Sequence, residues 1–405
     1  MNWEKTTIGE HCTVTSSKRF HLSERSTSGV PFYCSKEIIQ KVNGHEIIEC
    51  DYIREELYEQ VKKQFGVPKT GDLLITTRGT YGVPYIYSAT DRFYFADGNL
   101  TWLKDFDKKL LPEFLLYWVK SHEGQGKIDA IAKGTAQKAV PIISIKALEI
   151  PLPQITQQKR IIDILSAYDN LIENNQKQIK LLEEAAQRLH KEWFVDLRFP
   201  GYETTPVVDG VPEGWELCHL EDVIEFNPKV PLSKERLKQS VPMSALSTSS
   251  MTLDTEEFAA TFSNSGSKFQ NGDTLLARIT PCLENGKTAF VAGVESDEGA
   301  VGSTEFIVMR SKGINPYMVY LLARNDSFRQ SAINSMTGSD GRQRAQADKL
   351  KALPYLKPTD QIMMLFARYV EPMFIQIQKK NEQNVRLRQA RDRLLPKLMS
   401  GEVEV

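Results

Sequence analysis

Residues 158–194, QKRIIDILSAYDNLIENNQKQIKLLEEAAQRLHKEWF, decide the architecture of this chain. Apolar side chains recur along this stretch at alternating steps of four and three residues, and Asn175 is the one polar residue at these positions. The spacing is the heptad repeat of a coiled-coil seam and predicts one helix of roughly 55 Å, at about 1.5 Å per residue. A buried Asn costs stability but fixes register and partner choice. The expected seam residues are Ile161, Leu165, Tyr168, Ile172, Asn175, Ile179, Leu182, Ala186, Leu189 and Trp193.

A second helical segment, from about 361 to 395, follows a less regular pattern. When it is aligned with the first at an offset of 206 residues, Asn381 falls opposite Asn175. Pro372 is expected to kink or interrupt its first turns and Pro396 to mark its end, because proline has no N–H to donate. With so polar a seam, this helix is expected to pack antiparallel against the first. Its aligned seam residues are Phe374, Gln378, Asn381, Val385, Arg388, Asp392 and Leu395.

Each helical segment follows a globular segment, and the two globular segments share motifs in the same order. Trp3-Glu4 is echoed by Trp215-Glu216, residues 71–75 by 272–276, and residues 145–148 by 350–353, at offsets of 212, 201 and 205. This order indicates an internal duplication. We therefore expect an α+β fold: two mixed α/β domains separated by two long helices that form an antiparallel coiled coil. The expected bounds are 1–150 for the first domain, 151–200 for the first helical spacer, 201–214 for a linker, 215–353 for the second domain and 354–405 for the second spacer.

Composition restricts the class of protein. The 405 residues carry a formal net charge of -1, so any binding of nucleic acid must depend on local charge. There is no run of 18 apolar residues and no signal-peptide pattern at the N-terminus. The five cysteines are scattered, which indicates reduced thiols in a cytoplasmic protein and no zinc site.

A search for catalytic motifs finds none that holds. Residues 281–288 end in G-K-T, but a phosphate-binding loop needs glycine at the first position, where this chain has Pro281. Motifs of adenine methyltransferases, zinc proteases and dinucleotide-binding folds are missing, and the six histidines have no metal-ligand spacing. His190 lies on the long helix and is expected to be solvated. The chain is therefore expected to be non-catalytic and to bind no cofactor itself.

Two loops in each repeat combine glycine, hydroxyl and basic residues. The first loops are 77–82 and 278–287, and the second loops are 133–138 and 337–344. Arg and Gln can pair with guanine and adenine edges, and Lys can hold phosphates, so these loops are candidates for DNA contact. Ordinary polar surface loops are the alternative, and Tyr81 is a type of residue more often found in strands or cores. The candidate contacts are Arg78, Tyr81, Lys133, Thr135, Gln137, Lys138, Arg278, Asn285, Lys287, Ser339, Arg342, Gln343 and Arg344.

Three stretches resemble one family. Residues 151–202, PLPQITQQKRIIDILSAYDNLIENNQKQIKLLEEAAQRLHKEWFVDLRFPGY, are similar to the first conserved region of Type I restriction-modification specificity subunits. Residues 387–403, LRQARDRLLPKLMSGEV, are similar to their second conserved region. Residues 272–287, GDTLLARITPCLENGK, resemble a motif of their target recognition domains.

The resemblance implies the function. Each recognition domain would read one half of a split double-stranded DNA target, and the paired helices would set the gap. Two methyltransferase subunits, which use S-adenosylmethionine to methylate adenine, would be the partners, with motor-nuclease restriction subunits as optional further ones. A coiled-coil assembly adaptor without a DNA role, or a DNA-modifying enzyme with degenerate motifs, is the alternative. The resemblance assigns the following residues to the spacer and partner interface: Ile161, Leu165, Tyr168, Ile172, Asn175, Ile179, Leu182, Leu189, Trp193, Phe374, Asn381, Val385 and Leu395.

Overall fold

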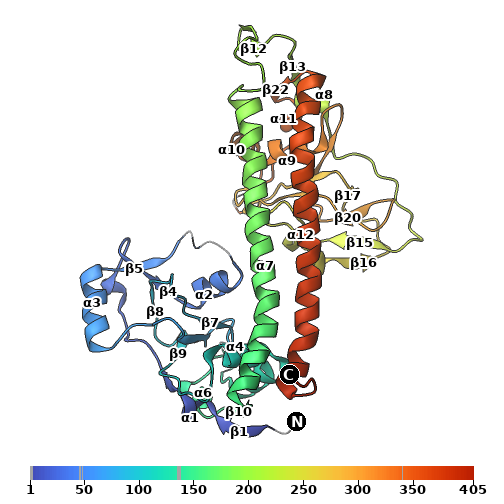
Figure 1. Ribbon diagram of the computed structural model, residues 1–405. Coiled ribbons are helices and arrows are strands. Elements are labelled where there is room, and N and C mark those ends of the chain that lie inside the picture. The colour runs from blue at the N-terminus through green and yellow to red at the C-terminus, as the bar shows by residue number, and fades with distance from the viewer. Residues whose placement is uncertain (1–2, 45–46, 48, 135–137, 340) are drawn as a thin grey trace. The chain divides into compact units, whose positions relative to one another are not determined.

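The structure is a computed structural model that describes residues 3–44, 47, 49–134, 138–339 and 341–405. The fold is α+β, as the sequence predicts, with mixed globular parts and two long helices (Figure 1). The chain divides into a first unit, Met1–Glu173 with Arg386–Val405, and a second unit, Asn174–Val385. Each unit therefore holds one globular repeat together with part of α7 (Ile155–His190) and part of α12 (Asp360–Ser400).

Within the described residues of the first unit, the strands form two four-stranded sheets and one two-stranded ribbon. The antiparallel sheet has the order β2-β9-β6-β7, and the mixed sheet has the order β3-β5-β4-β8 with β4 parallel to β8. β1 pairs with β10, so the first and last strands of this repeat lie together. The strands are β1 (Glu4–Thr7), β2 (Thr13–Thr15), β3 (Arg25–Ser26), β4 (Val30–Tyr33), β5 (Asp51–Ile53), β6 (Leu73–Thr76), β7 (Pro84–Ile86), β8 (Tyr94–Phe95), β9 (Leu100–Lys104) and β10 (Glu149–Leu152). The shorter helices are α1 (Ile8–His11), α2 (Ser35–Val42), α3 (Glu55–Gln64), α4 (Pro112–Lys120), α5 (His122–Ile131) and α6 (Ile142–Lys146).

The second unit repeats this arrangement in the part that the structure describes, which confirms the duplication. Its antiparallel sheet β14-β21-β18-β19 matches β2-β9-β6-β7 strand for strand, and its ribbon β13-β22 matches β1-β10. A mixed sheet has the order β16-β15-β20-β17, with β15 parallel to β20. The strands are β13 (Glu216–His219), β14 (Ile224–Phe226), β15 (Lys238–Val241), β16 (Ala259–Thr261), β17 (Ser267–Phe269), β18 (Thr274–Ala277), β19 (Thr288–Phe290), β20 (Ala300–Gly302), β21 (Phe306–Ser311) and β22 (Pro354–Lys357). The shorter helices are α8 (Leu220–Val223), α9 (Pro316–Arg324), α10 (Asp326–Asn334) and α11 (Ala347–Lys351).

The repeated Gly-Asp pair builds the same turn in both units. In Gly71-Asp72 and in Gly272-Asp273, the glycine φ angles are 92° and 91°, in the left-handed region that favours glycine. The first aspartate accepts a hydrogen bond from Trp102 on β9 at 2.8 Å. The second accepts two from Arg310 on β21 at 2.7 Å. Each turn therefore ties the start of a buried strand, β6 or β18, to its longer neighbour.

A shared cap joins two helices in each repeat. Ser121 lies between α4 and α5, and Asn325 lies between α9 and α10. Their side chains accept backbone hydrogen bonds from Gly124 at 3.1 Å and from Ser327 at 2.8 Å. Such caps satisfy orphan N–H groups at a helix start. α4 packs on β7 and α9 packs on β19, so the helix pair fixes the segment that follows it beside the antiparallel sheet.

In the first unit, the beginning of α7 packs against the end of α12. The carboxylate of Asp169 accepts a hydrogen bond from Arg391 at 2.6 Å, and also one from the Tyr117 hydroxyl at 2.9 Å. This ion pair joins both helices to α4 of the globular repeat. The helix residues buried in the same hydrophobic cluster are Ile161, Leu165, Leu395, Leu398 and Met399.

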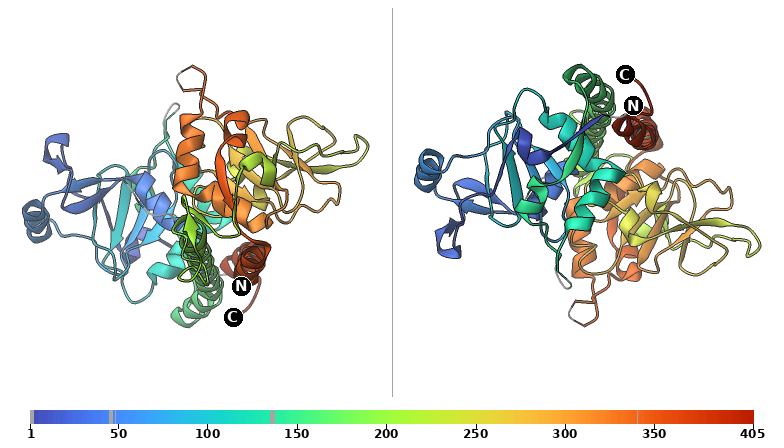
Figure 2. Two further views of the ribbon diagram at one scale, coloured as in Figure 1. Left: turned by 90° about the horizontal axis from the view of Figure 1, so that it is seen from above. Right: turned by 90° about the horizontal axis from the view of Figure 1, so that it is seen from below.

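In the second unit, the later part of α7 packs against the earlier part of α12 (Figures 1 and 2). The side-chain amide of Asn175 donates to Asn384 at 2.9 Å and to Gln383 at 3.2 Å. In the π-helical turn Lys191–Val195, which directly follows α7, the ring of Trp193 lies 5.6 Å from that of Phe366. Because later residues of α7 meet earlier residues of α12, the two helices run antiparallel in this unit, as predicted.

The seam of α12 differs from the aligned positions. Asn381 is only partly buried, whereas Asn384, the partner of Asn175, is 2% exposed. Phe374 and Leu395 are buried as expected. The repeat alignment pairs positions whose residue numbers increase together along the two helices. In antiparallel packing, later positions of α7 instead meet earlier positions of α12. The aligned residues that are not buried are Gln378, Asn381, Val385 and Arg388, which are partly buried, and Asp392, which is exposed.

Helix α12 runs through both of its prolines. Pro372 does not interrupt the helix, and the expectation that Pro396 ends it is wrong, because the helix is continuous from Asp360 to Ser400. Both prolines are exposed, while Phe374 and Leu395 beside them are buried. Packing of the opposite face maintains the helix at the points where each proline removes a hydrogen bond.

Besides Gln158 near its start, helix α7 buries two further polar residues that the heptad pattern does not mark. His190, expected to be solvated, is 4% exposed, and its ring lies 5.4 Å from Phe194 and 6.2 Å from Phe366. Burial lowers the pKa of His190 to about 4. Glu183 is 5% exposed and accepts a hydrogen bond from the backbone N–H of Met251 at 2.7 Å. The globular repeat also packs on α7, so the buried face of this helix is wider than a helix–helix seam.

A short hairpin forms within the stretch predicted as a linker. β11 (Val207–Val208) pairs antiparallel with β12 (Val211–Pro212). Asp209 and Gly210 between them both have positive φ, which is the backbone conformation of a two-residue hairpin turn. The domain bounds expected from the sequence stay predictions.

Two expectations from composition can be compared with the structure. No helix in the described ranges is both long enough and apolar enough to span a membrane. The five cysteines are all free thiols, as their scattered positions indicate.

Candidate nucleic-acid interface

In the second unit, the two candidate loops lie side by side. The first loop connects β18 to β19, and the second connects α10 to α11. Arg344 forms backbone bridges with Ile279 of the first loop and with Thr337 of its own loop. The backbone N–H of Ala345 also donates to the carbonyl of Arg278 at 2.8 Å. Segments about 65 residues apart in the chain thus form one continuous surface.

The first unit brings its two loops together in the same way. Ala139 forms backbone bridges with Arg78 of the first loop and with Lys133 of its own loop. The N–H of Val140 donates to the carbonyl of Thr77 at 3.0 Å. The sequence predicts each loop but gives no signal for their contact, because no motif spans both loops.

A helix side chain holds the end of the first loop in each unit. Gln125 on α5 donates to the carbonyl of Gly82 at 2.8 Å, and Arg324 at the end of α9 donates to the carbonyl of Gly286 at 2.9 Å. These side chains lie behind the loops and were not among the candidate contacts. Both hydrogen bonds fix the loop before any ligand is bound, which reduces the ordering cost of binding.

Glu305 joins the two loops of the second unit through their arginines. Its carboxylate accepts hydrogen bonds from Arg344 at 2.7–3.0 Å and from Arg278 at 3.2 Å. These hydrogen bonds, that of Arg344 first, hold the pKa of the Glu305 carboxyl below its ordinary value. Both guanidinium groups keep part of their surface exposed, at 36% for Arg278 and 38% for Arg344. We call these three residues the Arg-Glu-Arg cluster.

Sequence reasoning missed Glu305. It precedes β21 with no motif around it, and it lies 27 and 39 residues from its two partners. Only an indirect signal was available. Glu305 is an acidic residue directly before the long strand β21, and β21 pairs with β18, the strand that leads into Arg278.

The other candidate residues differ in their availability. Lys287 donates its ammonium to the carbonyl of Met243 at 3.0 Å, so it holds the loop from inside the domain. Tyr81 packs against the core of the first unit, and its side chain hydrogen-bonds Asp129. This placement agrees with the alternative that Tyr81 is a core residue. Thr135 and Gln137 lie outside the described residues. The exposed candidates are Arg78, Lys133, Lys138, Asn285, Ser339 and Arg342, with Gln343 partly buried.

The G-K-T stretch at 286–288 has the wrong surroundings for a phosphate-binding loop. It leads into strand β19 rather than into a helix, so no helix N-terminus points at the loop. Across the described ranges, no three His, Cys, Asp or Glu side chains gather in a way that could hold a metal ion.

The sequence of the chain is similar to that of known DNA-specificity proteins. Residues 1–184 match the family model of the Type I restriction modification DNA specificity domain. Over 372 residues the chain is 26% identical to the Type I restriction enzyme MjaIX specificity subunit of Methanocaldococcus jannaschii, which covers 83% of this chain and 78% of that relative. The matched family and this relative are Type I restriction-modification specificity subunits, and the chain is similar to them. The chain is also 35% identical over 140 residues to the EcoAI specificity subunit of Escherichia coli, covering 33% of this chain and 23% of that relative.

The fold agrees with this similarity. The crystal structure of a Type I restriction-modification S subunit from M. genitalium superposes with a TM-score of 0.58 at 17% identity, covering 98% of this chain and 96% of that chain. The family makes the chain a DNA-specificity component rather than a catalytic subunit.

Proposed function

We propose that this chain, as a specificity subunit, selects a two-part DNA target, with one half read by the paired loops of each unit. The observation that carries the proposal is the repetition: equivalent backbone bridges join the same two loops in both units. Each loop pair exposes cations in a chain whose formal net charge is -1. Two copies of one surface suit two separate half-sites, because each copy can carry its own base-reading side chains.

The first unit would use unpaired cations. Arg78, Lys133 and Lys138 are exposed. The Arg78 guanidinium passes over Gly98, where an added Cβ would lie 3.6 Å from it, and it forms no ion pair within the described residues. An exposed arginine without a carboxylate partner can bind a phosphate or a guanine edge without breaking an existing ion pair.

The second unit would use arginines that are already oriented. The Arg-Glu-Arg cluster fixes two guanidinium groups before DNA arrives, and Arg342 adds an exposed cation on the same loop. Bidentate Arg–guanine contacts depend on the direction of the guanidinium plane, so this orientation favours guanine in the second half-site.

The antiparallel helices would set the gap between the half-sites. The contacts that support a fixed register are Asn175 with Asn384 in the second unit and Asp169 with Arg391 in the first. A buried amide pair disfavours slippage, because a shifted register would leave both side chains without partners.

Two methyltransferase subunits, which carry S-adenosylmethionine, would bind as partners, and restriction subunits could join them. In the second unit, several apolar side chains on the long helices face solvent: Leu181 at 64%, Met364 at 63% and Tyr369 at 54% exposure. Exposed apolar side chains on helices are typical of protein interaction surfaces. These residues are the candidates for partner contact on the second unit.

The test uses one variant in each unit. Lys138→Ala and Arg342→Ala are expressed with the methyltransferase subunit, and methylated adenines on a plasmid library are mapped by single-molecule sequencing. Loss of methylation should depend on the first half-site for Lys138→Ala and on the second for Arg342→Ala. Equal damage to both halves by either variant would contradict the assignment of one half-site to each unit. No methylation with the wild-type chain, despite a bound methyltransferase, would favour an assembly adaptor.

A further inference from the structure

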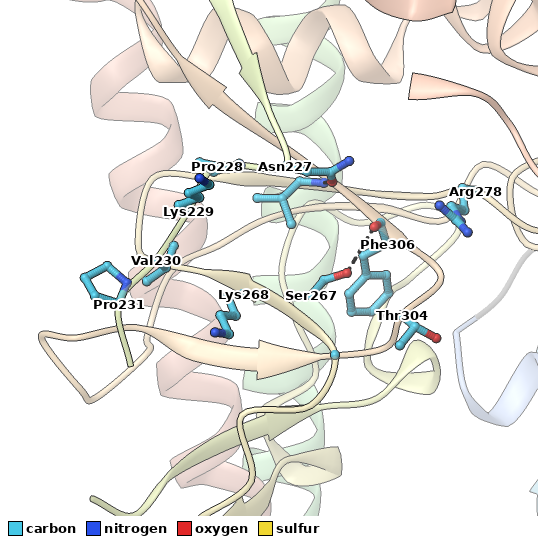
Figure 3. A pocket seen from close by; sticks show the side chains of 12 residues that line it. Asn227, Pro228, Lys229, Val230, Pro231, Ser267, Lys268, Arg278, Thr304 and Phe306 are labelled. Carbon is cyan, nitrogen blue, oxygen red and sulfur yellow. Dashed lines mark hydrogen bonds between the residues drawn. The ribbon is translucent and has the colours of Figure 1, made fainter. Parts of the chain in front are cut away.

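The second unit contains a groove that the candidate loops do not account for. Its volume is about 550 Å³, and it lies between the 227–231 segment and β17 (Figure 3). Figure 3 shows Lys229 and Lys268 toward one end and Arg278 with Thr304 toward the other. The groove therefore begins at the Arg-Glu-Arg cluster and extends away from it.

The charge of the groove is one-sided. Of its twelve lining residues, three are cationic and none is acidic. Within the described residues, Lys229 and Lys268 have no ion-pair partner, and Lys229 is exposed. Glu305, the nearest acid in sequence to Thr304, is already neutralised by Arg278 and Arg344. A concave surface with unpaired cations of one sign concentrates anions.

The walls of the groove are held in place by the backbone. Asn227 has a φ of 52°, its N–H donates to the carbonyl of Val308 at 2.7 Å, and its side chain accepts from the N–H of the same residue at 3.0 Å. On the other wall, the Ser267 hydroxyl donates to the carbonyl of Phe306 at 3.1 Å. Phe306 is 2% exposed and forms an apolar floor. The groove is therefore formed before any ligand binds.

We infer that this groove holds backbone phosphates of the DNA strand whose bases face the loops of the second unit, with Lys229, Lys268 and Thr304 as phosphate contacts. The inference rests on the proposed function and adds contacts outside the candidate loops. DNA is favoured over a free phosphate because Arg278 belongs to both the groove and the cluster, so one strand can contact both. Phosphate contacts position a protein on the duplex but do not read bases, and this predicts a distinct signature for these residues.

The test is the salt dependence of binding by the full chain in complex with its methyltransferase. One DNA duplex contains the sequence motif at which host DNA is methylated, and a second duplex of equal length lacks this motif. The variants are Lys229→Ala with Lys268→Ala, and Lys268→Arg. Lys312→Ala is the matched control, since Lys312 follows the far end of β21, roughly 20 Å from Phe306 at about 3.3 Å per residue.

Each lost phosphate contact should reduce the slope of log K against log salt by about 0.9. The double variant should therefore lose about 1.8 in slope on both duplexes, with unchanged preferred bases, and Lys268→Arg should keep the wild-type slope. A slope equal to that of Lys312→Ala, or an altered half-site sequence, would overturn the inference while leaving the proposed function intact. If the wild-type complex binds neither duplex, the proposed function fails and this inference fails with it.

Discussion

Asn175 and Asn384 form a buried amide pair, with 2.9 Å between the donating nitrogen of Asn175 and the accepting oxygen of Asn384. The two side chains are 5% and 2% exposed. Their contact defines the register of α7 and α12 in the second unit.

Asn175→Leu should destabilise the protein by about 1–3 kcal/mol, because Asn384 would stay buried without this partner. Replacing both asparagines with leucine should restore most of that stability, since the seam then becomes apolar. Denaturant unfolding of the single and double variants measures the coupling. Asn174→Ala is the matched control, because Asn174 is the exposed neighbour of the same type. Additive effects of the two substitutions would contradict the pairing.

Removing one heptad from each helix should shorten the gap between the half-sites. Residues 176–182 of α7 and 377–383 of α12 adjoin the amide pair on the same side, so deleting both leaves Asn175 beside Asn384. Seven residues correspond to about 10 Å of helix, or roughly three base pairs at about 3.4 Å each. Sequencing of methylated DNA gives both gap and half-sites.

The control for this prediction is deletion of 176–182 alone, which shifts one helix against the other and should abolish methylation. An unchanged gap in the paired deletion would show that the helices do not set the spacing. Altered half-site sequences would show that the helices take part in base reading.

Glu305→Gln should change recognition of the second half-site only. The substitution keeps the shape of the side chain but weakens the ion pairs that orient Arg278 and Arg344. Discrimination at a guanine of that half-site should fall by about 1–3 kcal/mol, or roughly 5- to 150-fold. Non-specific affinity should rise, because one negative charge is lost. Competition binding with single-base variants of the motif measures both. A changed first half-site would contradict the placement of the cluster.

The raised pKa of Glu183 predicts how the stability of the folded protein changes with pH. Burial raises its pKa to about 7 from an ordinary value of 4.5. The folded state then binds the proton more tightly than the unfolded state, so this contribution to stability is present below pH 4.5 and is lost as the pH rises through 7. Glu183→Gln stays neutral and can still accept from Met251, so its stability relative to wild type should increase from pH 5 to pH 8, by on the order of 3 kcal/mol.

Thermal unfolding of Glu183→Gln and wild type at both pH values provides the measurement. His190 titrates in the opposite sense but is present in both proteins, so its effect cancels in the difference. Glu184→Gln is the control, since Glu184 is exposed. A stability difference that does not change with pH would contradict the burial of a titrating Glu183.

The long helices and the duplication could be predicted because they are periodic features of the sequence. The heptad of α7 and the repeated Gly-Asp turn each depend on neighbours close in the chain. Asn384 could not be predicted from the repeat alignment, because antiparallel packing does not follow that alignment. His190 and Glu183 were missed because packing of a globular repeat on the helix decides their burial.

In the candidate site too, features that depend on nearby residues could be predicted, and features that depend on the fold could not. The loops were predictable from glycine and basic residues within short windows, but their contact through Ala139 and Arg344 depends on the fold. Glu305 and the lysines of the groove come from different strands and loops, so no window of sequence contains them together. Lys287 is of a residue type that often contacts DNA, but its ammonium group donates a hydrogen bond to the backbone of its own domain.

The role as a specificity subunit is best tested by a map of methylated adenines in host DNA with and without this gene, read by single-molecule sequencing. Deletion should remove methylation at one split motif, and the wild-type gene on a plasmid should restore it. Restoration with Arg342→Ala should be weaker, and any change in the recognised bases should fall in the second half-site. An unchanged methylation map, together with no methyltransferase bound to the purified chain, would contradict the role as a specificity subunit.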